Sequence, residues 1–319
     1  MKPKIVYLDS HVLNPGDLSW APLERLGAFT AYDRTAPAEV VARAAAADVL
    51  MINKVRIGAA ELDAMPRLRL ICVSATGYDM VDVAAARERG VVVCNCPGYS
   101  THAVAQHVAA LLLEVCNHAG HYAREVKNGL WTRSRDFCVW DEPLTELHGR
   151  RAAVVGLGHI GMRVAEIFCA LGLQVFAVTS KDESALPAGI RKISEADAFA
   201  SCHVVSLNCP LTAENARFVG AKLLDNCRPG LVLINTARGG LVDDAAVAAA
   251  LADGRLGAYC ADVLSTEPPA EDNPLLSAPR AYLTPHIAWA SAAARSRIID
   301  IVCENIRAFM DGRPVNVVN

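Results

Sequence analysis

The chain has 319 residues, which is enough for two domains with a large buried core. Hydrophobic residues make up 53% and charged residues 20%, so the composition excludes an intrinsically disordered chain. The formal net charge is −3 and the Lys and Arg residues are scattered, which excludes a basic surface for nucleic acid or anionic lipid. The longest apolar stretch of helical character, residues 103–116, is too short and too polar to span a bilayer. We therefore expect a cytoplasmic protein that binds neither nucleic acid nor a membrane.

Short β-branched runs alternate with alanine-rich stretches along the whole chain. The runs predict strands at residues 5–8, 49–52, 70–73, 91–94, 152–155, 174–178, 204–207, 231–235, 257–261 and 281–283. The alanine-rich stretches predict helices at residues 38–45, 81–88, 101–118, 162–171, 245–251 and 290–311. This alternation is typical of βαβ units and of parallel sheets whose strands are buried on both faces.

Ten strands are too many for one doubly wound sheet, and the glycine fingerprint that opens a dinucleotide-binding fold arrives only at Gly156. An earlier α/β unit must therefore precede it, and the last helix can cross back to complete that unit. Residues 130–149, with Trp131 and Trp140, show no period and predict an irregular arm.

The 11 cysteines include no C-x-x-C pair. No His or Cys pair follows Cys94 and Cys96 at a spacing that would complete a zinc site. We interpret the cysteines as reduced core thiols and expect no metal site.

A glycine-rich turn joins a predicted strand to a predicted helix. Residues 152–155 are followed at once by Gly156, Gly158 and Gly161 in the spacing G-x-G-x-x-G. The first glycine permits a tight turn, the second lets the backbone approach a pyrophosphate, and the third allows close helix–strand packing. The helix N-terminus then offers free N–H groups to phosphate, so the segment predicts a dinucleotide site.

The next strand ends without the carboxylate that usually binds the ribose hydroxyls of NAD. Thr179 stands at that position and is followed by Ser180, Lys181 and Asp182. Hydroxyl groups and an ammonium suit a 2′-phosphate, so the sequence favours NADP(H) over NAD(H). Asp182 keeps NAD(H) open if the loop folds it inward.

Three polar side chains follow the ends of later strands. Arg238 lies after the strand at 231–235, beside two glycines, and offers a bidentate fork for a carboxylate. Glu267 and His286 follow the last two strands in proline-bounded loops. A carboxylate beside an imidazole fixes its tautomer, so this set can hold a 2-oxo acid and transfer one proton.

With these motifs in order, the chain resembles the D-isomer-specific 2-hydroxyacid dehydrogenases along nearly its whole length, and most closely their glycerate dehydrogenase/hydroxypyruvate reductase members. The pieces that carry the resemblance are residues 74–82, 156–161, 208–212, 235–243, 261–268 and 285–290. It implies a nucleotide-binding Rossmann domain at residues 101–287, inserted in a substrate-binding domain made of residues 1–100 and 288–319. It also implies a homodimer.

The resemblance assigns roles to individual residues. His286 would be the acid/base with Glu267 as its partner, and Arg238 would bind the substrate. Further substrate contacts would come from the backbone of Ala75, Thr76 and Gly77 and from Trp289. Cofactor contacts would come from His159, Ile160, Cys209, Pro210, Thr236, Ala237, Asp262 and His286, besides Arg238, the three glycines and residues 179–181.

The expected activity is reversible reduction of hydroxypyruvate or glyoxylate with NAD(P)H. A broader 2-oxo acid reductase and a dinucleotide-sensing regulator of the same fold remain alternatives. Glu267 argues against the formate dehydrogenases, which resemble this pattern but carry Gln there. Trp140 is either a packing aromatic or an arm residue that reaches a partner's active site.

Overall fold

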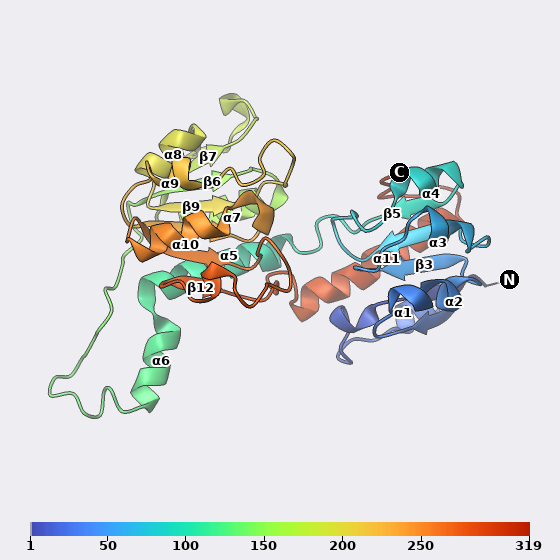
Figure 1. Cartoon of the computed structure of the whole chain (residues 1–319), viewed down its shortest axis with the longest axis horizontal. Helices are drawn as coiled ribbons and strands as arrows, with labels where there is room; N and C mark the ends of the chain where they lie inside the picture. Colours follow the sequence, from blue (N-terminus) through green and yellow to red (C-terminus); the bar gives the residue numbers. More distant parts are fainter. Residues whose placement is uncertain (1) are drawn as a thin grey trace. The chain divides into compact units, whose positions relative to one another are not determined.

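The computed structural model describes residues 2–319 (Figure 1). The chain forms two compact units: unit 1 comprises Met1–Ser100 and Trp289–Asn319, and unit 2 comprises Thr101–Ala288. Each unit contains one sheet in which all strand pairings are parallel, so the prediction of two parallel α/β sheets is confirmed. Among residues 2–319, no helix is long and apolar enough to cross a bilayer.

Unit 1 has a five-stranded sheet of order β2-β1-β3-β4-β5. Its strands are β1 (Lys4–Tyr7), β2 (Ala28–Ala31), β3 (Val49–Ile52), β4 (Leu70–Val73) and β5 (Val92–Cys94). Its helices are α1 (Ala21–Glu24), α2 (Val40–Ala44), α3 (Ala59–Asp63), α4 (Val83–Glu88) and α11 (Ala292–Met310), with 3₁₀ turns η1 (Ser10–Val12) and η2 (Pro37–Glu39).

Alternate residues of these strands point to opposite faces, and both faces are covered. On one face Val6, Leu50 and Ile71 form a buried cluster with Val40 of α2 and Leu62 of α3. On the other side α11 lies against β4 and α1 packs on α11. The C-terminal helix therefore packs on the first sheet.

The strand order of unit 1 reverses between β1 and β3, and an internal carboxylate occupies that point. Asp9 follows β1 and accepts three backbone N–H bonds from the segment after β3. Asn53 donates to one oxygen at 2.8 Å, and Lys54 and Val55 donate to the other at 2.6 and 3.0 Å. The carboxylate thus satisfies N–H groups that would otherwise need another acceptor.

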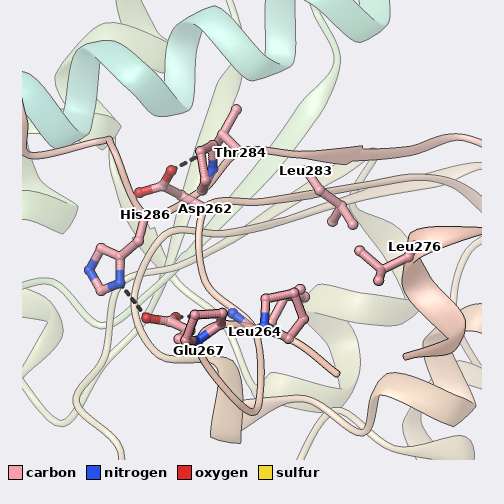
Figure 2. Close-up of a pocket in the computed structure, with 10 residues that line it drawn as sticks. Asp262, Leu264, Glu267, Leu276, Leu283, Thr284 and His286 are labelled. Atoms are coloured by element: carbon pink, nitrogen blue, oxygen red, sulfur yellow. Dashed lines mark hydrogen bonds and ion pairs between the residues drawn. The ribbon is translucent and has the colours of Figure 1, made fainter. Parts of the chain in front are cut away.

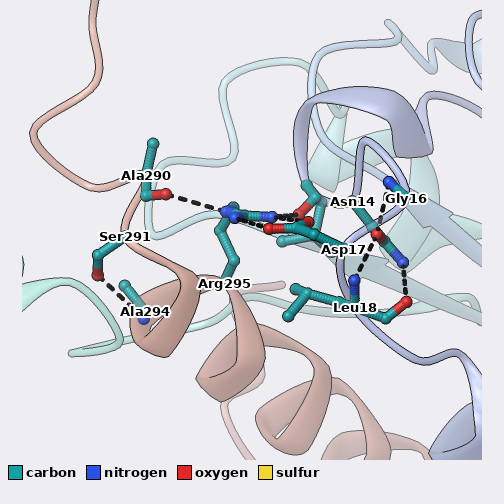
Figure 3. Close-up of polar contacts among 9 residues, drawn as sticks. Asn14, Gly16, Asp17, Leu18, Ala290, Ser291, Ala294 and Arg295 are labelled. Carbon is teal, nitrogen blue, oxygen red and sulfur yellow. Dashed lines mark hydrogen bonds and ion pairs between the residues drawn. The ribbon is translucent and has the colours of Figure 1, made fainter.

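Arg295, in the first turn of α11, joins the start of this helix to the loop after β1 (Figure 3). It is only 8% exposed and makes two bonds to the Asp17 carboxylate, at 2.7 and 2.6 Å. The same guanidinium donates to the carbonyls of Leu13 and Ala290 at 3.0 and 2.9 Å. Its hydrogen bonds lower the pKa of Asp17. The chain just after the unit boundary is therefore fixed to the body of unit 1.

Unit 2 has a seven-stranded sheet of order β12-β11-β10-β9-β6-β7-β8. Its strands are β6 (Arg151–Val155), β7 (Gln174–Val178), β8 (Arg191–Lys192), β9 (Val204–Leu207), β10 (Leu231–Asn235), β11 (Leu256–Ala261) and β12 (Ala281–Leu283). Its helices are α5 (Thr101–Asn117), α6 (Ala119–Lys127), α7 (His159–Ala170), α8 (Glu195–Ser201), α9 (Ala221–Leu224) and α10 (Asp244–Ala252). Its 3₁₀ turns are η3 (Glu183–Ala185), η4 (Gly239–Leu241) and η5 (Pro274–Leu276).

Two helical layers cover the seven-stranded sheet. Val154 of β6 faces the layer of α5 and α7, where it shares a cluster with Phe168. Val155, the next residue, faces the layer of α8, α9 and α10 and packs in the cluster that contains Phe199. Burial on both faces explains why these strands are continuous apolar runs and not alternating ones.

An arm extends from unit 2 (Figure 1). The chain turns at His118, whose φ is 49°, and then forms α6 and an irregular segment up to β6. The irregular part was predicted at residues 130–149, whereas α6 was not. Helix α6 has no buried residue. Its apolar residues Ala119, Tyr122, Ala123 and Val126 nevertheless have the spacing i, i+3, i+4, i+7 of a helix face, so the signal was present in the sequence and was overlooked.

The ten predicted strands are present within about two residues of their predicted ends. The structure adds β2 and β8, each of which forms one edge of its sheet. Both are short and largely exposed, with burial patterns that show no buried residue. Edge strands of this kind carry little of the hydrophobic pattern that identifies a strand.

Candidate active site

The strand order of unit 2 reverses at β6, which has β7 on one side and β9 on the other. Ligands of open α/β sheets bind at the carboxyl ends of the strands beside such a reversal. Gly156 follows β6 there, and Asn208 and Cys209 follow β9. The Asn208 N–H donates to the Val155 carbonyl at 2.7 Å, so the two strand ends are held together.

The three fingerprint glycines have distinct roles in this turn. Gly156 has a φ of 88°, and a Cβ there would lie 2.7 Å from the backbone of Cys209. A Cβ at Gly161 would collide with the Gly156 carbonyl. Gly158 caps α7, and a Cβ at that residue would meet nothing within 4 Å. The first and third glycines are therefore required by packing, while the second leaves open space at a helix N-terminus, where phosphate binds favourably.

Two buried oxygens at neighbouring strand ends have no hydrogen-bond partner among residues 2–319. They are Asn208 Oδ1 after β9 and Thr236 Oγ1 after β10. Buried polar atoms without partners are uncommon in folded proteins, and a bound ligand can supply the missing bonds. Burial also raises the pKa of the Cys209 thiol, which keeps it uncharged beside the glycine turn. These residues fit a dinucleotide.

The end of β7 carries hydroxyl and ammonium groups. Thr179 is half-buried, and its Oγ1 accepts the Lys181 N–H at 3.2 Å, while Ser180 and Lys181 are exposed. The Lys192 ammonium, from β8, donates to the Lys181 carbonyl at 2.8 Å. A second cation therefore lies at this loop. Asp182 is exposed and occupies the N-cap position of η3, where its side chain makes no capping hydrogen bond.

Arg238 stands in a turn that Asn235 organises. The Asn235 side chain is fully buried, donates to the Arg238 carbonyl at 2.9 Å and accepts the Ala237 N–H at 3.1 Å. The Arg238 side chain is exposed and donates to the Ala237 carbonyl at 2.7 Å. Sequence reasoning missed Asn235, although a polar residue at the end of an apolar strand was the available signal.

Glu267 and His286 are brought together from the loops that follow β11 and β12 (Figure 2). Glu267 Oε2 lies 2.5 Å from His286 Nδ1, and Oε1 accepts the Leu264 N–H at 3.1 Å. An ionised carboxylate can only accept, so Nδ1 carries the proton. Nε2 is thereby left for a ligand. Both side chains are 37% exposed, so solvent reaches the pair.

The His286 backbone has a φ of 54°, a left-handed conformation that costs a non-glycine residue about 1–3 kcal/mol. Asp262, whose side chain is 1% exposed, holds the backbone around His286 in this conformation. Its carboxylate oxygens accept the N–H groups of Ile287 and Ala288 at 2.8 and 2.7 Å. Its carbonyl accepts the His286 N–H at 2.9 Å. Both carboxylate oxygens of Asp262 therefore shape the loop that carries the imidazole.

A pocket of about 430 Å³ borders the Glu267–His286 pair (Figure 2). Most of its wall is apolar, so the carboxylate–imidazole contact has a weakly polar neighbourhood on this side. The apolar lining consists of Leu264, Pro268, Pro269, Leu276, Leu283 and Pro285, and the polar lining of Asp262, Glu267, Thr284 and His286.

The remaining expected substrate residues belong to unit 1. The Ala75 carbonyl accepts the Cys96 N–H at 2.9 Å, and Thr76 Oγ1 donates to the Cys96 carbonyl at 3.0 Å. Gly77 follows in the same loop, after β4. Trp289 packs edge-on against Tyr99, with ring centroids 6.2 Å apart. Among residues 2–319, no group of three or more His, Cys, Asp or Glu side chains is arranged to hold a metal ion.

Comparison with known proteins places this geometry in context. Residues 109–288 match the family model described as D-isomer specific 2-hydroxyacid dehydrogenase, NAD binding domain. The chain is 41% identical to the hydroxypyruvate reductase of Blautia hydrogenotrophica, with 99% of each chain covered. It is 36% identical to the glycerate dehydrogenase of Methylorubrum extorquens, with 100% of this chain and 99% of the relative covered. A Sinorhizobium meliloti structure, an NADPH-dependent glyoxylate/hydroxypyruvate reductase with NADP and malonate, superposes with a TM-score of 0.82 at 29% identity, covering 100% and 97% of the two chains.

The glycine turn generates a direct test. We expect Gly156→Ala to weaken dinucleotide binding by about tenfold or more, or ~1.4 kcal/mol, because the new Cβ pushes the Cys209 backbone out of place. Gly254→Ala is the matched control, since Gly254 has a similar φ of 82° but open space around a Cβ. Titration of the two variants with NADH and NADPH, followed by fluorescence, measures the difference. Equal affinities would show that the Gly156–Cys209 approach is not needed.

Proposed function

The chain belongs to the D-isomer-specific 2-hydroxyacid dehydrogenase family, as its sequence predicted, and we propose that it reversibly reduces a small 2-oxo acid to the D-2-hydroxy acid. The observation that carries the proposal is the 2.5 Å contact of Glu267 with His286 at the carboxyl edge of the dinucleotide-type sheet. Hydroxypyruvate and glyoxylate are the proposed substrates, because relatives similar over their full lengths are named for these acids or for glycerate.

His286 is the proposed acid/base. Reduction places a hydride on the carbonyl carbon and a proton on the carbonyl oxygen, and the nicotinamide ring supplies the hydride when it is bound. His286 donates the proton from Nε2, because Nδ1 is engaged by Glu267. The Glu267 carboxylate fixes the orientation and the tautomer of the ring. In the oxidation, His286 takes the proton back.

The other roles are divided between the two units. In unit 2, the residues proposed to hold the cofactor are the three fingerprint glycines, residues 159–160, 179–181, 209–210 and 236–238, Asp262 and His286. Arg238 binds the substrate carboxylate with its planar fork. In unit 1, the residues proposed to contact substrate are 75–77, through their backbone, and Trp289, through its side chain. Units 1 and 2 are thus the proposed substrate and nucleotide domains.

The acid/base pair can be tested by matched substitutions. We expect His286→Gln to lower kcat for hydroxypyruvate reduction by roughly 10²–10⁴-fold, the usual contribution of a positioned acid. Glu267→Gln should also lower kcat, while Glu271→Gln, an exposed carboxylate four residues on, should not. Because reduction consumes the imidazole proton, kcat/KM for reduction should fall as pH rises, and that for oxidation should rise. Near wild-type turnover of His286→Gln on every 2-oxo acid would refute the assignment.

Turnover assays also distinguish the two alternative functions, a broad 2-oxo acid reductase and a dinucleotide sensor. Steady-state rates with hydroxypyruvate, glyoxylate, pyruvate and phenylpyruvate distinguish a hydroxypyruvate reductase from a broad 2-oxo acid reductase. A chain that binds NADH or NADPH but turns over none of these acids would instead be a dinucleotide sensor of the same fold.

NADP(H) is the proposed preference, and it rests on the end of β7. Thr179 occupies the position of the carboxylate that usually binds the ribose hydroxyls of NAD, and a carboxylate there would repel a 2′-phosphate. Lys181 and Lys192 supply positive charge at the same loop. One structural relative is described as NADPH-dependent, which supports this choice.

Substitution of this loop tests the cofactor preference. We expect Lys181→Ala to raise KM for NADPH by about tenfold or more and to leave KM for NADH nearly unchanged, since a hydrogen bond to a charged group contributes ~1.5–3 kcal/mol. Thr179→Asp should shift the preference toward NADH. Lys222→Ala, an exposed lysine on α9, is the control. A wild-type enzyme that uses NADH at least as efficiently as NADPH would contradict the proposal.

The arm of unit 2 supports the proposed homodimer. Phe137 is 88% exposed, Trp140 65% and Trp131 55%. Large aromatic side chains gathered on an extended segment mark a surface that another molecule covers, and identical chains most often pair with twofold symmetry. Trp140 is proposed to reach the substrate site of the second copy.

Light scattering and kinetics test the arm. We expect a dimer in solution, and we expect Phe137→Ser to shift the equilibrium toward the monomer because an apolar contact is lost. Val12→Ser, which changes another exposed apolar side chain outside the arm, should leave the dimer intact. Trp140→Ala should change the ranking of hydroxypyruvate against phenylpyruvate. An unchanged ranking would restrict Trp140 to packing, and a monomeric wild type would contradict the dimer.

A further inference from the structure

A chain of three polar side chains leads from helix α5 to the loop of His286. Thr284 Oγ1 lies 2.6 Å from Asp262 Oδ1 and 2.9 Å from His107 Nε2. His107 Nε2 is also 3.7 Å from the same Asp262 oxygen, so the three groups are in mutual contact. Asp262 in turn holds the backbone of the residues that follow His286.

The direction of each hydrogen bond follows from the number of protons available. The Asp262 carboxylate accepts only, so the short contact requires Thr284 to donate its single hydroxyl proton to Oδ1. The Thr284 oxygen must then accept from His107, which means that Nε2 of His107 carries a proton. Neutral imidazole with this tautomer and charged imidazole both meet the requirement. The network is therefore independent of the charge on His107.

His107 is a partly enclosed side chain on a helix that packs into the core of unit 2. Its side chain is 19% exposed, and its neighbours on α5, Val108 and Leu111, are buried in the core of unit 2. Asp262 is 1% exposed, and an enclosed carboxylate depends on each donor that reaches it. Thr284 has an alternative acceptor in the Ala261 carbonyl, 3.5 Å away. Without His107 the hydroxyl can turn toward that carbonyl, and Asp262 then loses a donor.

We propose that His107 is a positioning residue for His286 and acts through Thr284 and Asp262. By fixing the Thr284 hydroxyl it completes the bonds of Asp262, and Asp262 keeps the His286 backbone in its left-handed conformation. The imidazole is thereby placed for proton transfer, where a displacement of about 1 Å can cost on the order of 10²-fold in rate. The inference rests on the proposed function, because it assigns His286 the acid/base role.

Two substitutions at His107 separate positioning from simple packing. His107→Gln keeps an N–H donor, whereas His107→Met fills similar space without one. We expect His107→Met to lower kcat by about tenfold, with the melting temperature and the dissociation constant for the cofactor close to wild type. His107→Gln should recover most of the rate. Equal rates for His107→Met and wild type, or no recovery in His107→Gln, would overturn the proposal.

A double-mutant cycle tests whether the effect passes through Thr284. Thr284→Val removes the hydroxyl at constant shape, and Thr284→Ser retains it. If the two residues act in series, Thr284→Val combined with His107→Met should lose little more rate than either alone, because members of one network are not additive. Multiplication of the two losses would overturn the proposed route.

A spectroscopic readout keeps this test separate from that of the activity. The His286 Nδ1 proton, held by Glu267, should give a low-field proton resonance in ¹⁵N-histidine-labelled protein, assigned by its loss in His286→Gln. We expect the resonance to shift or broaden in His107→Met and Thr284→Val and to persist in His107→Gln and Thr284→Ser. A resonance unchanged in all four variants would refute the positioning role, even in a protein that reduces no 2-oxo acid. Failure of the wild type to turn over 2-oxo acids would refute only the proposed function.

Discussion

The buried carboxylate of Asp262 is the constraint on which the arrangement of the candidate site depends. An ionised group at 1% exposure is stable only when hydrogen bonds replace its lost hydration. Three of these bonds come from Thr284, Ile287 and Ala288, so the loop that carries His286 is shaped by the needs of this one group. The position of the His286 imidazole is thus a consequence of the hydrogen bonds that the buried Asp262 carboxylate needs.

The candidate site combines a buried support with a solvent-exposed carboxylate–imidazole pair. Glu267 and His286 are each 37% exposed, whereas the groups that hold their loops are buried. Asn235 is fully buried and closes the turn of Arg238 in the same manner. Polar residues at the ends of buried strands therefore fix the backbone, and the exposed side chains of the candidate site project from it into solvent. A proton can exchange with water while the orientation of the imidazole is preserved.

Much of this organisation could be predicted from the sequence, because the responsible signals are local. The central strands are apolar runs, and Gly156, Gly158 and Gly161 follow one of them at a recognisable spacing. Contacts between distant residues could not be predicted in this way. His107 is 177 residues from Thr284, and its place on α5 has no mark that separates it from a packing histidine. Helix α6 was missed for a different reason: its apolar residues have helical spacing, but the helix is only nine residues long and directly follows α5.

Asp9 makes the two units differ at the point where their strand order reverses. Both sheets reverse their strand order at one point, which in such folds is the natural place for an anionic ligand. In unit 1 that place is taken by a carboxylate of the chain itself, bound by the N–H groups of residues 53–55. The backbone N–H groups at this point of unit 1 are therefore already bound to the Asp9 carboxylate. The corresponding groups of unit 2 remain available for an anionic ligand. Two similar frameworks can therefore coexist in one chain without competing for the same phosphates.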